Sequence, residues 1–167
     1  MLRHLILLST LCTAISCGGE VYDTIPGTLT PVIHVPEQAL SWSKCLVGQT
    51  HQEDECIGQP RRLALCANDT CQESPATDAC HKLGAGWRLP TFFEYERLRY
   101  LWPVYEDHFD FPEVRTAILT NTAHQDSQEL AVAYQLNPYD PELSPWILFS
   151  KTAGAWVHCV SVAHTVF

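Results

Sequence analysis

The chain has 167 residues and carries 10 lysines and arginines against 19 aspartates and glutamates, a formal net charge of −9. An acidic chain argues against nucleic acid as a partner, because phosphate binding needs a basic face. The same charge weakens simple electrostatic attraction to sulfated sugars or anionic lipid headgroups.

The N-terminal residues 1–16 have the three-part pattern of a secretory signal. A positive start at Arg3 precedes an uncharged apolar run over 5–15, which ends in small residues. This run has about 11 residues, whereas a membrane-spanning helix needs roughly 20. We therefore expect an exported chain whose signal is cleaved.

Cys17 directly follows Ser16 and precedes two glycines, an arrangement that resembles the lipobox of bacterial lipoproteins. In that family the cysteine is acylated, so the resemblance implies lipidation of Cys17 and a membrane as partner. A glycine after the cysteine implies sorting to the outer membrane, with the domain facing the periplasm or the cell exterior. Ordinary signal cleavage also fits, because a small-x-small site ends at Ser16.

Residues 17–36 are rich in glycine, proline and threonine and show no periodic apolar pattern, which is typical of an extended linker. We expect a tether that lifts a domain away from the membrane. The domain would occupy 37–167, about 130 residues, which is a normal size for one hydrophobic core. Its first strand is expected at 39–43.

Two short helices are predicted in the first half of this domain. Ser74 offers an N-cap side chain before a proline at the first helical position, and Gly84 would stop that helix. Thr91 and Glu94 have the spacing of a capping box, in which each side chain bonds the other residue's free amide. Apolar residues then recur at helical spacing until Pro103, which is expected to end the second helix.

The second half of the domain reads as strands separated by turn-forming residues. Four apolar or β-branched runs have strand length, and they cover 117–122, 130–136, 146–150 and 156–162. Two early helices followed by a strand-rich half predict an α+β fold.

The segment before the second helix carries a resemblance, and it reads Gly86-Trp87-Arg88-Leu89-Pro90-Thr91. With its flanks it resembles the Lcl C-terminal domain family, a group of exported bacterial domains with a C-type-lectin-like fold. The resemblance covers roughly 38–162 and implies two short helices and a twisted antiparallel sheet. Within the motif we expect Trp87 and Leu89 in the core and Arg88 beside an acidic side chain. His158 stands where the family has an arginine before its last cysteine.

The cysteines that remain after the signal and Cys17 number six, an even count that indicates a disulfide framework in an exported domain. They are Cys45, Cys56, Cys66, Cys71, Cys80 and Cys159. The resemblance to lectin-like folds implies a Cys80–Cys159 bridge between the first helix and the last strand. The other four pair most simply as Cys45–Cys56 and Cys66–Cys71, although four cysteines allow three pairings.

No metal or cofactor is expected. The spacing of Cys66, Cys71 and Cys80 is not that of a paired zinc motif, and exported cysteines normally oxidise. Acidic runs such as 53–55 are linear, whereas a calcium site needs six to eight converging oxygens.

The segment from Arg88 to Glu94 also resembles formylglycine-generating enzymes, which use a reactive pair of cysteines late in the chain. This chain has only Cys159 there, and a disulfide-bonded sulfur is no thiolate. The histidines of the domain are scattered and assemble no catalytic set by spacing. We therefore predict a non-catalytic domain, with an enzyme of this type or a purely structural envelope component as alternatives.

Lectin-like folds present ligand surfaces from the long loops between their late strands, which here are 123–129 and 137–145. Tyr134, Tyr139 and Trp146 lie in or beside these loops and are the predicted ligand-binding residues, because tyrosine and tryptophan are enriched at recognition surfaces. Core packing is the other explanation for each aromatic taken singly. Family members include adhesin-like modules, so the resemblance implies recognition of a glycan or a protein at the cell envelope.

Overall fold

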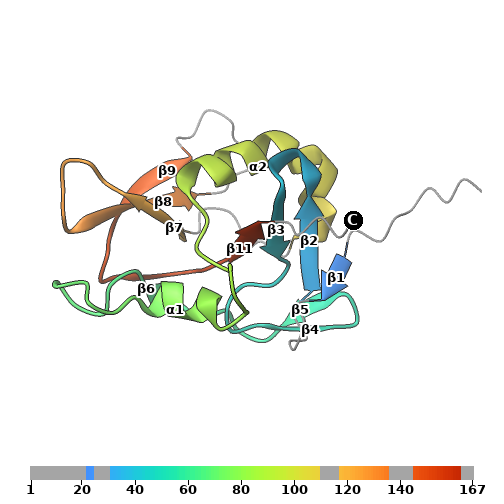
Figure 1. Cartoon of the computed structure of the whole chain (residues 1–167), viewed down its shortest axis with the longest axis horizontal. Coiled ribbons are helices and arrows are strands. Elements are labelled where there is room, and N and C mark those ends of the chain that lie inside the picture. The colour runs from blue at the N-terminus through green and yellow to red at the C-terminus, as the bar shows by residue number, and fades with distance from the viewer. Residues whose placement is uncertain (1–21, 25–30, 110–116, 136–144, 163–167) are drawn as a thin grey trace, which may run out of the picture.

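The computed structural model describes residues 22–24, 31–109, 117–135 and 145–162. Outside these ranges lie the expected signal at 1–16, Cys17, and Tyr139 with most of the loop at 137–145. The described residues form an α+β structure with two α-helices and several antiparallel sheets (Figure 1), as the sequence predicts. None of the described helices is long and apolar enough to cross a membrane.

The first sheet has four strands in the order β1-β2-β3-β11, and all neighbouring strands are antiparallel. Its strands are β1 (Tyr22–Thr24), β2 (Pro31–Val35), β3 (Leu40–Ser43) and β11 (Val160–Val162). β3 lies where the first strand was expected. β11 pairs with β3 through Val160 opposite Trp42, so the last described strand lies beside an early one.

The described part of the expected tether belongs to this sheet, so the expectation of an extended linker up to residue 36 is wrong. Ile33 and Val35 are fully buried, and they pair with Trp42 and Leu40 across β2 and β3. β-Branched residues suit a buried strand, and Pro31 stands at the first position of β2, where a strand tolerates proline. The domain therefore begins before the expected boundary.

The second sheet has the order β7-β8-β9 and matches three of the expected runs. Its strands are β7 (Ala117–Ala123), β8 (Leu130–Gln135) and β9 (Trp146–Ser150). A register shift between Leu119 and Thr122 interrupts the pairing of β7 with β8. At this bulge the Thr120 hydroxyl donates to the Val132 carbonyl and accepts from the Thr122 amide, which satisfies groups that the ladder leaves unpaired.

Helix α1 (Pro75–His81) begins as the sequence predicts. Ser74 Oγ accepts a hydrogen bond from the Thr77 amide at 3.3 Å, and proline follows at the first helical position. After His81 the chain turns toward Gly84, whose φ is +138°. Glycine adopts such a conformation without a Cβ clash, so Gly84 stops the helix as expected.

Helix α2 (Phe92–Tyr105) has the expected capping box. The Thr91 amide donates to Glu94 Oε2 at 2.7 Å, and the Glu94 amide donates to Thr91 Oγ1 at 3.3 Å. Two of the amides that every helix start leaves free are thereby satisfied. The Phe92 amide donates to Thr122 Oγ1 at 2.9 Å, so this helix start is also attached to β7.

The expectation that Pro103 ends the second helix is wrong, because α2 continues to Tyr105. Proline lacks the amide that would bond the carbonyl one turn earlier, but it costs only one hydrogen bond so close to the helix end. Tyr105 is buried, and its hydroxyl donates to Glu37 Oε2 at 2.9 Å. This tertiary anchor holds the last turn in place.

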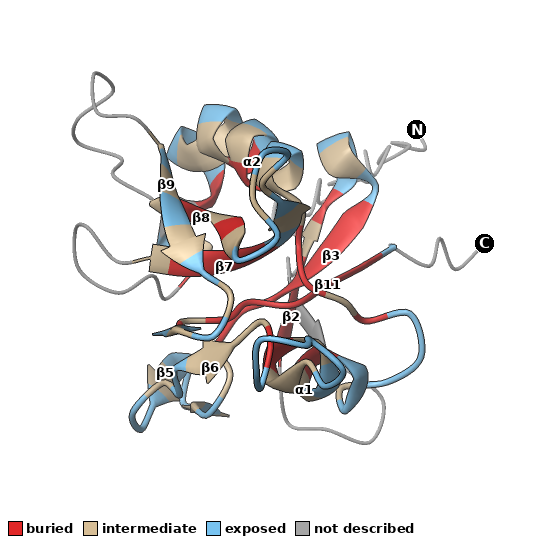
Figure 2. Cartoon of the chain, turned by 90° about the vertical axis from the view of Figure 1, so that its left-hand side faces the viewer, coloured by how far each residue is buried: buried red, intermediate tan, exposed pale blue. Residues whose placement is uncertain are grey.

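Two hydrophobic clusters fill the space between these elements, and Figure 2 shows them as buried segments of the central strands and the inner helix faces. The first packs α2 against both larger sheets around Trp42, whose ring meets that of Tyr95 edge-on at 5.0 Å between centroids. The second lies next to α1 and contains Trp87 and Leu89, as the motif predicts. The two helices lie on opposite sides of the molecule, with strands between them (Figure 1).

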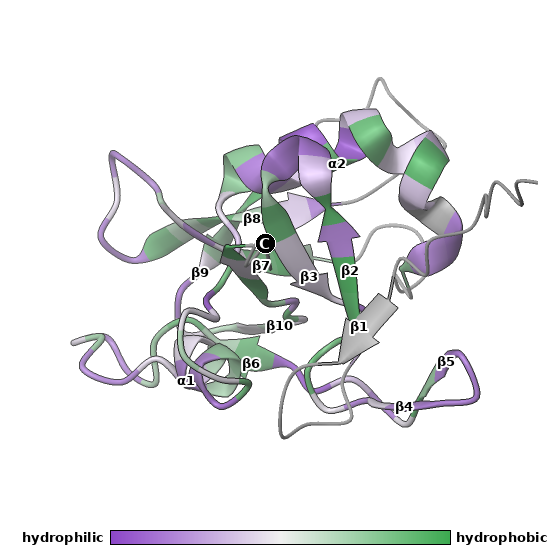
Figure 3. Ribbon diagram, turned by 45° about the vertical axis from the view of Figure 1, so that its right-hand side comes forward, coloured by the Kyte–Doolittle hydropathy of each residue, from purple (hydrophilic) through white to green (hydrophobic). Residues whose placement is uncertain are grey.

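The remaining elements are short, and the sequence did not predict them. They are β4 (Thr50–Gln52), β5 (Glu55–Ile57), β6 (Leu63–Ala64), β10 (Gly154–Ala155) and the 3₁₀ turns η1 (Pro36–Gln38) and η2 (Glu106–His108). β4 pairs with β5 in a largely hydrophilic arm (Figure 3), and β6 pairs with β10. The strand expected at 156–162 is divided, because Trp156 forms a single bridge to Ile118 and β11 begins only at Val160.

Candidate functional site

The cysteines of the domain form three disulfides, with the pairing that was expected. They are Cys45–Cys56, Cys66–Cys71 and Cys80–Cys159. Both sulfurs of the last bridge belong to fully buried residues in the second hydrophobic cluster. Three disulfides indicate an oxidising, exported environment.

The Cys80–Cys159 bridge leaves Cys159 without a free thiol. Cys159 was the one cysteine in the position of a catalytic thiol, and in the structure its sulfur is bonded to Cys80. A thiolate nucleophile needs an unbonded sulfur with access to solvent. Among the described residues no group of three or more His, Cys, Asp or Glu side chains is placed to hold a metal ion.

His158, beside this bridge, is a core histidine. Its Nδ1 donates to the Ser43 carbonyl at 3.0 Å, and the side chain is fully buried. Burial lowers the pKa of His158 to about 4, and the hydrogen bond to Ser43 opposes that shift only in part. The imidazole is therefore neutral near pH 7, and it holds the segment before β11 to the end of β3.

Arg88 of the sequence motif pairs with Glu94, the acidic neighbour that the sequence could not name. Its guanidinium donates to both carboxylate oxygens, at 2.9 and 2.5 Å. Partial burial by itself would raise the pKa of Glu94, but hydrogen bonds from Arg88 and the Thr91 amide outweigh it, so this pKa lies below its ordinary value. The hydrogen bond to Glu94 raises the pKa of Arg88. The motif thus locks the start of α2 and has a structural role.

Tyr134 is not part of a ligand surface, so this sequence prediction is wrong. The residue is fully buried in the middle strand β8, and its ring stacks on that of Tyr95 at 5.2 Å between centroids. Its hydroxyl donates to Glu96 Oε1 at 2.9 Å. Burial, and then this hydrogen bond, raise the pKa of Tyr134 far above its ordinary value. The side chain packs under α2 because β8 is covered there.

Trp146 is the member of the predicted surface that the structure leaves accessible. It lies opposite Tyr134 on the neighbouring strand β9, and 48% of its surface is exposed. Leu148, two residues along the same strand face, is 43% exposed. With Tyr134 buried and Tyr139 outside the described residues, the three aromatics are not brought together as one described surface.

A different tryptophan lines a cavity in the described part of the domain. This cavity, called the Trp156 pocket below, has a volume of about 510 Å³, within the range of roughly 300–1,000 Å³ that is typical of small-molecule sites. Its lining combines apolar side chains, two amides and one cation, and consists of Leu46, Gln49, Gly58, Gln59, Pro60, Arg62 and Trp156. Most of these residues come from one cysteine-rich segment, and Trp156 comes from the other end of the domain.

Backbone contacts hold Trp156 against β7, on one side of the pocket. The Trp156 amide donates to the Ala117 carbonyl at 3.2 Å, and its carbonyl accepts from the Leu119 amide at 2.8 Å. The Arg62 guanidinium lies over the Trp156 ring, 5.7 Å from its centroid. An arginine above an indole face is an attractive cation–π arrangement, so the two side chains fix one another.

Two glycines leave room for Arg61 and Arg62 to pack closely against the neighbouring backbone, with Gly48 beside Arg61 and Gly154 beside Arg62. A Cβ on Gly154 would lie only 3.2 Å from Arg62 Cβ, and one on Gly48 would overlap the Arg61 side chain. Gly48 also has a φ of +98°, which favours glycine. The Arg61 amide donates to the Val47 carbonyl at 2.8 Å. The wall of the pocket is therefore set by backbone packing before any ligand binds.

In the described part of the chain, neither Arg61 nor Arg62 has a carboxylate at ion-pair distance. The Trp156 pocket thus offers a guanidinium with unused donors beside an aromatic ring.

Sequence reasoning missed this pocket. Trp156 reads as the first residue of a strand, and Arg62 lies in a segment without any periodic pattern. Their contact joins residues 94 positions apart, numbered 62 and 156. The glycines at 48 and 154 are a local signal of close backbone packing, but glycines do not indicate which ligand a pocket would bind.

Comparison with known proteins adds no assignment. No family model matches the chain, and neither curated proteins nor solved structures show a match. The resemblance to Lcl C-terminal domains, carried by the motif around Trp87, therefore stays a prediction.

Proposed function

We propose that this protein is a non-catalytic recognition domain of the cell envelope and that its ligand binds in the Trp156 pocket. The observation that carries the proposal is the cavity of about 510 Å³ with Arg62 and Trp156 on its wall. Tryptophan and arginine are the residue types most enriched among energetically dominant contacts. A prearranged wall lowers the entropy cost of binding.

The lining favours a glycan over a purely apolar ligand. Leu46, Pro60 and Trp156 offer apolar contact to the C–H faces of a sugar ring, and Gln59 and Arg62 offer hydrogen bonds to its hydroxyl or carboxylate oxygens. Such a mixture of apolar walls with few polar groups is typical of specific small-molecule sites. A protein segment with the same mixture of groups is the second occupant to be tested.

The surrounding architecture is proposed to be a C-type-lectin-like domain on a lipid anchor. The α+β arrangement and the Cys80–Cys159 bridge from α1 to the segment before β11 support that fold. The signal pattern at 1–16 and the lipobox-like Cys17 support attachment to the outer membrane. A formylglycine-generating type of enzyme is disfavoured by the bonded sulfur of Cys159, and a purely structural envelope component would leave the Trp156 pocket without a use.

Titration of the mature protein with a glycan panel and with envelope proteins, followed by isothermal titration calorimetry, tests the proposal. We expect Trp156→Ala and Arg62→Gln each to weaken binding by about tenfold or more, as central contacts do. Trp146→Ala is the matched control, since it removes an exposed tryptophan on β9, outside the pocket.

Binding that is lost with Trp146→Ala but kept with Trp156→Ala would move the site to β9. Absence of binding to any glycan or envelope protein would refute the recognition function itself. Circular dichroism of each variant separates loss of the site from loss of the fold.

A further inference from the structure

The three disulfides differ in how far solvent reaches them. Cys80 and Cys159 are fully buried, and in the Cys45–Cys56 bridge Cys45 is buried and Cys56 half-buried. Cys71 is the one exposed half-cystine among the described residues, and it is bonded to the buried Cys66. Thiol–disulfide exchange requires a thiolate to reach one of the two sulfurs, so access favours the Cys66–Cys71 bond.

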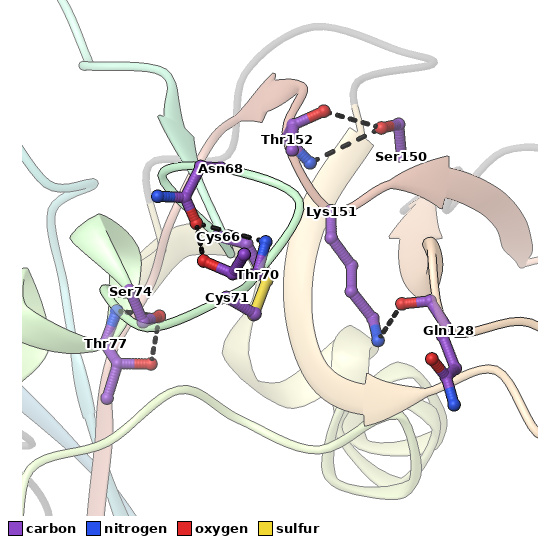
Figure 4. Close-up of a disulfide and its surroundings, with 10 residues drawn as sticks. All are labelled: Cys66, Asn68, Thr70, Cys71, Ser74, Thr77, Gln128, Ser150, Lys151 and Thr152. Atoms are coloured by element: carbon purple, nitrogen blue, oxygen red, sulfur yellow. Dashed lines mark hydrogen bonds between the residues drawn. A yellow bond between two sulfur atoms is a disulfide. The ribbon is translucent and has the colours of Figure 1, made fainter.

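The loop that this bond closes is short and has its own hydrogen bonds. Cys66 and Cys71 are five positions apart. Asn68 Oδ1 accepts from the Thr70 amide at 3.2 Å and from the Thr70 hydroxyl at 2.6 Å (Figure 4). The Cys71 amide donates to the Asn68 carbonyl at 3.1 Å. The loop therefore keeps much of its shape when the sulfurs separate.

Both ends of the loop are also attached to the rest of the domain without the disulfide. The Cys66 amide donates to the Lys151 carbonyl at 2.8 Å, and the Ala67 amide donates to the Glu73 carbonyl at 2.9 Å. Ser74 then caps α1 through Thr77, as Figure 4 shows. Opening this bridge frees a few residues at the surface and leaves the hydrophobic clusters untouched.

The backbone at Cys71 is strained in the bridged form. Its φ is +53°, the left-handed region that residues other than glycine seldom occupy. An open hollow of about 80 Å³, lined by both cysteines and by the turn at 150–152, lies beside the bond. Reduction would let Cys71 relax, and the hollow gives its sulfur space to move.

We propose that Cys66–Cys71 is a thiol–disulfide exchange site for a dithiol reductant, and that the other two bridges are structural. A thiolate of the reductant attacks the sulfur of the exposed residue Cys71 and forms a mixed disulfide, while Cys66 leaves as a thiolate and takes up a proton. The second thiol of the reductant then attacks its own sulfur in the mixed disulfide and releases Cys71. The protein gains two electrons and two protons, and the reductant becomes a disulfide.

Reduction of the native, mature protein by graded dithiothreitol, followed by alkylation and peptide mass mapping, tests this inference. We expect the Cys66 and Cys71 peptides to be alkylated at least about tenfold faster than those of Cys45 and Cys56, because access controls the exchange rate. Near-ultraviolet circular dichroism should be retained at that stage, and reoxidation should restore the bond.

A second variant probes the loop itself. Asn68→Ala removes the two side-chain hydrogen bonds to Thr70, so we expect the reduced pair to reoxidise more slowly by about threefold or more, since the sulfurs meet less often. Ser150→Ala, on the opposite wall of the hollow, is the matched control and should reoxidise at the native rate. Simultaneous opening of all three bridges, or earlier opening of Cys45–Cys56, would overturn the proposal.

Discussion

Around Trp42, helix α2 and strands of both larger sheets bury their apolar faces against one another, and this cluster contains no cysteine. The segment at 44–73, called the cross-linked segment below, has strands of only two or three residues and holds two of the three disulfides within itself. The first region gains its stability from area removed from water. The second has too little apolar surface for that, and covalent links limit its unfolded states instead.

The two regions therefore use their side chains differently: the buried cluster for packing, and the cross-linked segment for the proposed contacts with other molecules. A region that is stabilised by burial uses its side chains on its own interior, as Tyr134 shows. A cross-linked segment can leave polar and charged groups facing outward, and Arg62 of that segment lines the Trp156 pocket. The proposed ligand site and the proposed exchange site both lie in or against the cross-linked segment.

The largest expected effect concerns the fully buried bridge that joins α1 to the segment before β11. Replacing Cys80 and Cys159 by serine releases a loop of 79 positions and should lower the free energy of unfolding by about 4 kcal/mol. Replacing Cys66 and Cys71, only five positions apart, should cost about 2 kcal/mol. Urea unfolding without reductant measures both. Equal losses would mean that the two bridges stabilise the chain alike and would break the comparison.

The second effect is a dependence of stability on pH, which arises from the fully buried His158. The folded pKa of His158 is about 4, below its ordinary value of 6.5, so the unfolded chain binds a proton first as the pH falls. Stability should therefore drop between pH 6.5 and 4, by about 3 kcal/mol in total.

His158→Asn keeps a donor for the Ser43 carbonyl and has no titrating group, so the variant should lose this part of the pH slope. Thermal unfolding from pH 7 to pH 4 provides the measurement. An unchanged slope in the variant would show that His158 is not the group responsible.

The smallest effect compares the two helix starts. Thr91→Ala removes an acceptor from the capping box of α2 and should cost about 1 kcal/mol. Ser74→Ala removes the equivalent acceptor of α1, but Cys80 holds that helix by a disulfide, so we expect a smaller loss. Chemical denaturation of both variants measures this, and a larger loss for Ser74→Ala would contradict the assigned role of the bridge.

Local chemistry was enough to place several elements. Ser74 with its following proline, and Thr91 with Glu94, mark helix starts because a side chain satisfies a backbone amide only a few residues away. β-Branched and apolar runs placed the strands of the second sheet. Where the deciding contact was distant, the same reasoning failed, as at Pro103, whose helix is held by Tyr105 and Glu37.

The sequence by itself determined the α+β class and the helix caps, because strand-length runs and short-range hydrogen bonds are local, and its six cysteines indicated disulfides without fixing their pairing. Only the tertiary structure decided that β2 belongs to the main sheet, that Tyr134 is buried, and that Arg62 meets Trp156. These outcomes depend on which faces pack together across the whole chain. The spacing of apolar residues predicts which face of a helix or strand is buried. Which residue packs against that face, and where a pocket forms, depends on residues that lie far away in the sequence.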